Sequence, residues 1–233
     1  MRFAIMAAGA LAASAVVLSG NTARADDATP TGIEVGLRVG YGLPLGDAAG
    51  APSGGQSVSL SNIYSGQIPI QIDAGYRFTP NMMVGAFFQY GIGMLNTGNG
   101  SLLQGCSTSG VSCSGNDMAF GVQFHYHLMP DQTIDPWGGI GVGYEIANIS
   151  ESAGGQSASE SFSGFQFVNL QIGADYKVMP NLGVGPFVQF SLGEYSSCST
   201  SGGAGAGGSC TIPNTAMHEW LTFGIRGAYD INL

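Results

Sequence analysis

Charged residues, and cations above all, are scarce in this sequence. Asp, Glu, Lys and Arg make up 9% of the 233 residues and the formal net charge is −9, whereas a typical soluble domain is about 25% charged. The cations beyond residue 25 are Arg38, Arg77, Lys177 and Arg226. Nucleic-acid binding requires Lys and Arg to neutralise phosphates, so this composition excludes nucleic acid as a partner.

A second long apolar run is also missing. After the N-terminal region, no uninterrupted apolar stretch approaches the roughly 18 residues of a membrane-spanning helix. The N-terminus has Arg2, an apolar run from Leu11 to Leu18 and the small-x-small sequence Ala23-Arg24-Ala25, which together are typical of a secretory signal peptide. We therefore predict that residues 1–25 are a cleaved signal peptide and that residues 26–233 form one exported domain.

One hairpin pattern occurs twice. Residues Ile70–Gly93 (IQIDAGYRFTPNMMVGAFFQYGIG) and Leu170–Gly193 (LQIGADYKVMPNLGVGPFVQFSLG) each contain two alternating segments around a Pro-Asn turn. Successive side chains of a strand point to opposite faces, so each copy predicts an antiparallel hairpin with one apolar and one polar face. Four further alternating segments complete a set of eight strands: Ile33–Tyr41, Met118–Leu128, Pro136–Ile146 and Trp220 to the C-terminus.

The ionisable side chains of these segments fall on the face opposite the apolar stripe. They are Glu34, Arg38, Asp73, Arg77, Glu145, Asp175, Lys177, Arg226 and Asp230. A Lys or Arg on the lipid face of a barrel costs roughly 2–4 kcal/mol at the midplane, and closure removes unpaired strand edges. We therefore predict an all-β fold, an eight-stranded antiparallel up-and-down transmembrane β-barrel with these groups inside. Strand segments of about 9–11 residues would span the bilayer.

The lengths of the connections alternate. Short links at 79–81, 129–135 and 179–181 alternate with long Gly- and Ser-rich links at 42–66, 92–116, 147–163 and 193–215. In outer-membrane barrels the short turns lie in the periplasm and the long loops lie outside the cell. We therefore expect both ends of the mature chain on the periplasmic side.

Four cysteines lie in two of the long links. Cys106 and Cys113 belong to one, Cys198 and Cys210 to the other, and both links contain the sequence Cys-Ser-Thr-Ser-Gly. Four cysteines permit three pairings, and in an oxidising compartment we expect the two local ones, Cys106 with Cys113 and Cys198 with Cys210. A metal site is the alternative, which the absence of His and of clustered carboxylates from both links disfavours.

The mature chain resembles the small outer-membrane barrels grouped as the outer membrane protein beta-barrel domain, similar to OmpA-, OmpX- and OmpW-type proteins. The resemblance is carried by the turns at Tyr76–Asn81 and Tyr176–Asn181 and by the segment Pro136–Tyr144. It implies residence in the bacterial outer membrane among lipids and lipopolysaccharide. It also implies insertion by the barrel assembly machinery, with an assembly signal at Tyr229, Ile231 and Leu233.

Function is less constrained than fold. We expect a structural or surface-interaction role, because an eight-stranded barrel is narrow enough for its own side chains to fill the interior and inward charges are normally paired. A narrow channel for small solutes is the alternative. A lipid A-modifying enzyme is a third class, which we disfavour because His125, His127 and His218 form no recognisable catalytic arrangement with a nucleophile. We expect no cofactor and no metal, and a surface ligand, if there is one, at the long loops.

Overall fold

The structure is a computed structural model and describes residues 32–51, 55–99, 101–202, 207–212 and 214–232. The predicted signal peptide and Leu233 of the predicted assembly signal lie outside these residues. The described part includes no helix with the length and apolar character of a membrane span.

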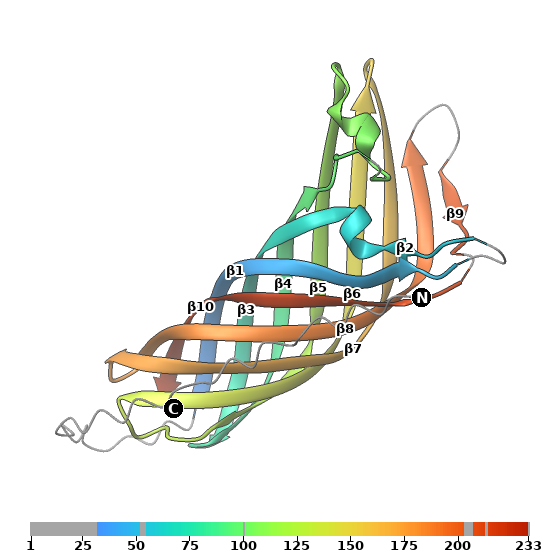
Figure 1. Cartoon of the computed structure of the whole chain (residues 1–233). Helices are drawn as coiled ribbons and strands as arrows, with labels where there is room; N and C mark the ends of the chain where they lie inside the picture. The colour runs from blue at the N-terminus through green and yellow to red at the C-terminus, as the bar shows by residue number, and fades with distance from the viewer. Residues whose placement is uncertain (1–31, 52–54, 100, 203–206, 213, 233) are drawn as a thin grey trace, which may run out of the picture.

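Eight long antiparallel strands close into a barrel, as the sequence predicts (Figure 1). Each strand pairs with the next along the chain, and the last pairs with both the first and the one before it, which closes the ring. The strands are β1 (Gly32–Ala49), β3 (Tyr64–Thr79), β4 (Met82–Leu95), β5 (Val111–His127), β6 (Ile134–Ala153), β7 (Gln156–Met179), β8 (Leu182–Gly202) and β10 (Met217–Asn232).

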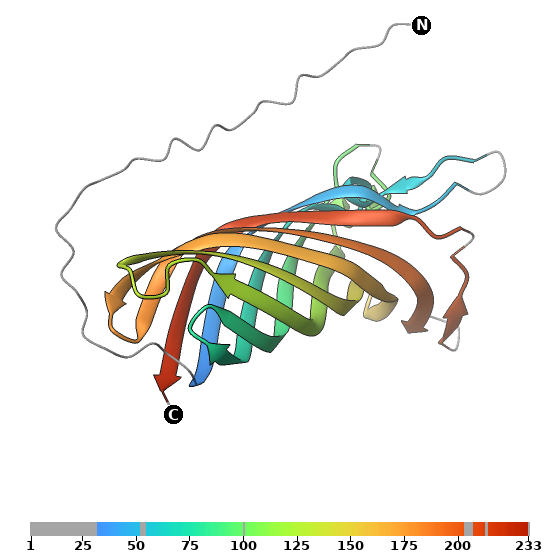
Figure 2. The same ribbon diagram turned by 90° about the horizontal axis from the view of Figure 1, so that it is seen from below.

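Four small elements lie outside this ring. Strands β2 (Val58–Ser59) and β9 (Gly208–Cys210) pair with β1 and β8, and the 3-10 helices η1 and η2 span Leu60–Asn62 and Gln104–Ser107. All four lie at the end of the barrel that carries the long connections. Figure 2 shows the opposite end, where the short turns join β3 to β4 and β7 to β8 and where β1 begins and β10 ends. This is the end that the short turns predict to face the periplasm.

The strands are longer than the 9–11 residues expected, and part of each predicted long loop is strand. Strands β6, β7 and β8 contain 20, 24 and 21 residues. The predicted loop 147–163 is instead a continuous hairpin, with Gly154 and Gly155 at its turn in the positive-φ region (+57° and +81°). The sequence did not indicate these extensions because, outside the membrane, both faces of a strand contact water and no apolar alternation is needed.

The two faces of the ring have opposite chemistry along the membrane span. Ile72, Val122 and Ile225 are 53%, 58% and 57% exposed on the outer surface, whereas Arg38, Asp73 and Arg226 are at most 1% exposed inside. The outer surface of the ring is therefore apolar, and the charged side chains of these strands lie inside.

Two β-bulges change which residues face inward near the outer end. In β7 the buried residues Gln166 and Asn169 are three positions apart rather than two, at a register shift with both neighbouring strands. A second shift in the β7–β8 pair lies between Ser163 and Gly164. An extra residue reverses the alternation that follows it, so Phe162 and Cys198 turn into the barrel.

Candidate functional site

The interior near the short-turn end holds an ionic cluster centred on Glu34. The two carboxylate oxygens of Glu34 accept hydrogen bonds from Arg77 and Arg226, and Arg226 also donates to Asp175. Asp230 lies nearer the mouth, with its Oδ1 3.4 Å from Arg77 Nη2. Strands β1, β3, β7 and β10 each contribute to this cluster, so it connects segments that are far apart in the sequence.

Arg38 extends the ionic cluster one layer outward. Its Nε donates to Asp73 Oδ2 at 2.7 Å and its Nη1 donates to Gln171 Oε1 at 2.7 Å. The indole of Trp137 lies beneath two guanidinium groups, 5.1 Å from Arg38 Cζ and 4.7 Å from Arg226 Cζ. The face of the indole attracts both guanidinium groups, which belong to directly paired residues of β1 and β10.

The histidines of β5 belong to the same cluster. His127 Nδ1 lies 2.6 Å from Asp135 Oδ2, and His125 Nε2 lies 2.9 Å from Gln171 Oε1. Both rings are at most 1% exposed. The sequence alone indicated no partner for His125 or His127 and placed Asp135 in a link, although its inward position in β6 follows the same alternation as Trp137.

Lys177 and Glu145 do not join the ionic cluster. Lys177 is half-buried at the short-turn mouth, where its Nζ donates to the carbonyl of Pro130. Glu145 lies toward the other end and accepts hydrogen bonds from Tyr195 Oη at 2.8 Å and Trp220 Nε1 at 3.3 Å. The predicted set of nine residues therefore divides into one cluster of seven and two separate positions.

A layer of amides fills the middle of the barrel. Gln71 Nε2 donates to Asp73 Oδ1 at 2.7 Å, and Gln171 Nε2 donates to Gln123 Oε1 at 3.1 Å and to Asn169 Oδ1 at 3.0 Å. All are buried. Strand alternation puts Gln71, Gln123 and Gln171 on the inward face, but it does not indicate their hydrogen-bond partners, because Gln123 and Gln171 lie 48 residues apart in the sequence.

A carboxyl pair lies above the amides. Asp117 and Glu145, each 1% exposed, come from the paired strands β5 and β6. His218 Nε2 lies 3.2 Å from Glu145 Oε1, and the rings of His218 and Tyr195 stack with centroids 4.0 Å apart. Lys and Arg are absent from this layer in the described residues, so Glu145 depends on neutral donors and one histidine.

A cavity of about 330 Å³ opens above Tyr64 and Tyr195 at the outer mouth. Leu60 of η1, which is fully buried, and Ile63 project into the mouth and pack against Ala48 and Ala147. The remaining lining is mainly aliphatic and aromatic, with Glu160 at the side. The mouth therefore has an apolar lining, unlike the polar interior beneath it.

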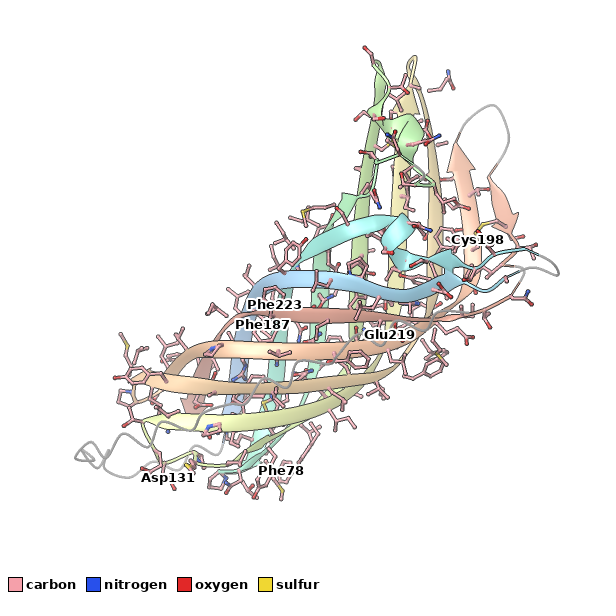
Figure 3. All side chains as sticks on the ribbon, in the orientation of Figure 1. Phe78, Asp131, Phe187, Cys198, Glu219 and Phe223 are labelled. Carbon is pink, nitrogen blue, oxygen red and sulfur yellow. A yellow bond between two sulfur atoms is a disulfide. The ribbon has the colours of Figure 1, made fainter. Side chains whose placement is uncertain are left out.

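Both predicted disulfides are present at this end. Cys106 bonds Cys113 and Cys198 bonds Cys210, with Cα atoms 5.7 Å and 5.0 Å apart. Figure 3 places Cys198 at the outer end, opposite Phe78 and Asp131 at the short-turn end. The second bridge holds β9 and the segment that follows it against β8, beside the cavity.

Two groups of side chains in the described residues have the spacing of a metal site. In one of them, Glu160 with Cys198 and Cys210, the two sulfurs form a disulfide and are not thiolate ligands. Ligand atoms of Glu34, His125 and His127 lie within 4.8 Å of one another. Arg77 and Arg226 already bond the Glu34 carboxylate and Arg38 approaches His125. Three guanidinium groups at this position repel a cation, so the group does not fit a metal ion.

Comparison with known proteins agrees with this architecture. The model of the outer membrane protein beta-barrel domain family matches residues 8–196. No curated protein matches the chain in sequence.

Several solved structures are similar to this chain. The outer membrane protein OprG of Pseudomonas aeruginosa is 13% identical, with 89% of this chain and 100% of that chain covered and a TM-score of 0.50. A major outer membrane protein of Thermus thermophilus is 14% identical, with 84% and 99% covered and a TM-score of 0.50. Neisserial surface protein A is 15% identical, with 86% and 98% covered and a TM-score of 0.45.

At such identities the structural similarity concerns the fold alone, whereas the family match spans most of the sequence. This chain belongs to the outer membrane protein beta-barrel domain family and is a protein of the bacterial outer membrane.

Proposed function

We propose that this protein is a sealed outer-membrane barrel with a structural or surface-interaction role, and that its lumen passes no solutes. The observation that carries the proposal is the position of Arg226, which is fully buried in the lumen and bonded to Glu34 of the neighbouring strand β1 and to Asp175 of β7. A solute path along the axis requires these ion pairs to separate. Removing one partner of a buried ion pair costs about 3–5 kcal/mol, so the closed arrangement is strongly favoured.

The successive layers of the interior support a plug rather than a pore. The ionic cluster, the amide layer and the carboxyl pair follow one another from the short-turn end to the outer mouth. In each layer a hydrogen bond joins strands that are not neighbours: Arg38 with Gln171, Gln189 with Gln89, and Trp220 with Glu145. At the short-turn mouth a cavity of about 20 Å³ lies between Arg77, Asp175 and Lys177. A space of that size holds about one water molecule.

The proposal assigns no reaction to the barrel. His125, His127 and His218 are each at most 1% exposed and each lies against an amide or carboxylate of the interior. A general base acting on a membrane lipid has to reach the lipid face or the rim. The enclosure of all three rings supports a structural role for them.

The partners we propose follow from the apolar outer belt and from the end that carries the long connections. The apolar belt contacts outer-membrane lipids and lipopolysaccharide, and its aromatic members Tyr76, Tyr126 and Tyr229 suit the membrane interface. Tyr229 and Ile231 alternate outward on β10, which supports their place in an assembly signal read by the barrel assembly machinery. Surface ligands would meet the long-connection end.

Planar-bilayer conductance tests the seal. We expect no steady ionic current from the wild-type protein, and measurable current from Arg38→Ala and Arg77→Ala, because each substitution removes a long buried side chain whose guanidinium group lies in the lumen. Leu37→Ala, on the lipid face of the same strand, is the control and should stay silent. Steady wild-type current that admits small solutes would overturn the proposal in favour of the narrow channel.

A further inference from the structure

The cavity at the outer mouth has the size and walls of a ligand site. Its volume of about 330 Å³ falls within the range of small-molecule pockets, about 300–1,000 Å³, which are mostly apolar with few polar groups. Its apolar wall includes Leu60, Ile63, Leu103, Ile149, Phe162 and Ile212. Every layer of the interior beneath it contains buried polar side chains, whereas the lining of the cavity is mainly apolar.

Several independent structural devices create this lining. The bulges in β7 and β8 turn Phe162 and Cys198 inward. Helix η1 inserts Leu60, which is fully buried although it belongs to a connection between strands. The disulfide between Cys198 and Cys210 fixes the chain just before Ile212. The wall therefore depends on four separate parts of the chain, each held by pairing, packing or a covalent bond.

The electrostatic environment of the cavity is negative. Glu160 is the one Asp or Glu side chain among the described residues that line it, and its Oε1 lies 3.7 Å from a disulfide sulfur, Cys198 Sγ, which brings no positive charge. The four long connections contain Asp47, Glu151, Glu160 and Glu194 and no Lys or Arg. Asp117 and Glu145 lie beneath the floor.

Aromatic rings complete the recognition chemistry. Tyr64 and Tyr195 form the floor and Phe162 the side, with the rings of Phe162 and Tyr195 6.1 Å apart. Aromatic faces attract cations within about 6 Å and gain most when water is excluded. An apolar wall, aromatic faces and an unopposed carboxylate together favour a molecule that is itself apolar and positively charged.

We propose that the outer-mouth cavity binds a small apolar organic cation, an amine or quaternary ammonium compound whose hydrocarbon part fills the cavity and whose charged group lies beside Glu160. Apolar anions are rejected, because no cation of the outer end can pair with them. The site lies above the ion pairs of the lumen, so the proposal does not depend on whether the barrel conducts.

Three naphthyl probes that differ in charge test this site. They are (1-naphthylmethyl)trimethylammonium, 1-naphthalenemethanol and 1-naphthalenesulfonate, titrated calorimetrically into the full barrel in zwitterionic nanodiscs, with empty nanodiscs subtracted. We expect the cation to bind about tenfold more tightly than the neutral alcohol, and the sulfonate to show no protein-dependent binding. Equal affinity for cation and anion would overturn the proposal.

Matched variants locate the binding. Glu160→Gln should lower the affinity for the cation to that for the alcohol, and Glu160→Lys should allow the sulfonate to bind. Glu151→Gln changes an exposed acid outside the cavity and should leave the affinities for all three probes unchanged. Ala49→Trp should fill the cavity and abolish binding of both cation and alcohol, whereas Ala86→Trp on the lipid face should not.

Retained binding in Ala49→Trp would also overturn the site. Heat-dependent mobility in detergent gels verifies that every variant is a folded barrel, and Glu160→Lys supplies a gain of binding that misfolding cannot produce.

Discussion

Arg226 on β10 and Glu34 on β1 form a buried ion pair across the strand pair that closes the ring, although 192 residues separate them in the sequence. The first and last strands are therefore joined by backbone hydrogen bonds in the barrel wall and by an ion pair in the lumen. Because Glu34 also binds Arg77 of β3, one carboxylate links three strands at the closure.

Glu34→Gln should destabilise the barrel strongly. The substitution keeps the shape of the side chain but removes the negative charge that Arg77 and Arg226 share, which leaves Arg226 with Asp175 and Arg77 with the more distant Asp230. Removing one partner of a buried ion pair costs about 3–5 kcal/mol. The free energy of unfolding in urea, measured in lipid vesicles, checks this expectation. Glu151→Gln at an exposed position is the control, and a Glu34→Gln variant as stable as that control would contradict the importance of the ion pair.

An arginine on the lipid face should cost more in the middle of the span than at its end. Val122 is 58% exposed and pairs with Ala86 and Val142, well inside the strands, whereas Ile134 is 55% exposed at the first residue of β6. We expect a loss of about 2–4 kcal/mol for Val122→Arg and about 0–1 kcal/mol for Ile134→Arg. The same unfolding measurement compares them, and equal losses would refute the predicted position of the membrane.

Gly173 packs against the ring of Trp137, so a methyl group added at Gly173 should destabilise the barrel. A Cβ at Gly173 would lie 2.6 Å from the Trp137 ring, whereas a Cβ at Gly138 on the paired strand would meet nothing closer than 3.8 Å. We expect Gly173→Ala to cost about 1–3 kcal/mol by overpacking, and Gly138→Ala to be nearly neutral. A displaced Trp137 should also change the intrinsic fluorescence, and an unchanged spectrum with unchanged stability would show that the indole moves freely.

Removal of the disulfides should act locally. Both bridges lie at the outer end, and neither joins strands of the membrane span across the barrel. The double variant Cys198→Ser/Cys210→Ser should keep the unfolding midpoint of the wild-type barrel. The β9 segment should become cleavable by protease, because the bridge that holds it to β8 is gone. Mass spectrometry of the fragments identifies the cut, with the Cys106→Ser and Cys113→Ser pair as the comparison; loss of the folded ring would contradict a local role.

The membrane-spanning half of the molecule could be predicted from the sequence because lipid imposes a strict alternation. Arg38, Arg77 and Arg226 had to face inward, and the structure places them there. Both cysteine pairings followed from their local spacing.

The outer end could not be predicted in the same way. The bulge between Gln166 and Asn169 has no sequence signature, yet it decides that Phe162 faces the cavity. Asp117 was missed because it lies at the edge of a predicted loop, and Leu60 because a short helix in a connection carries no periodicity. These features depend on contacts between distant segments, which local patterns do not record.

The β6–β7 hairpin projects beyond the mouth at the top of Figure 1, with Gly154 and Gly155 at its tip. From the rung Ala147–Phe162 to the rung Ala153–Gln156 the ladder rises about 20 Å at about 3.3 Å per residue. A Cβ at Gly154 or Gly155 would meet nothing within 4 Å, so the turn has open space around it. A short peptide tag inserted there should therefore leave the ring and the cavity folded.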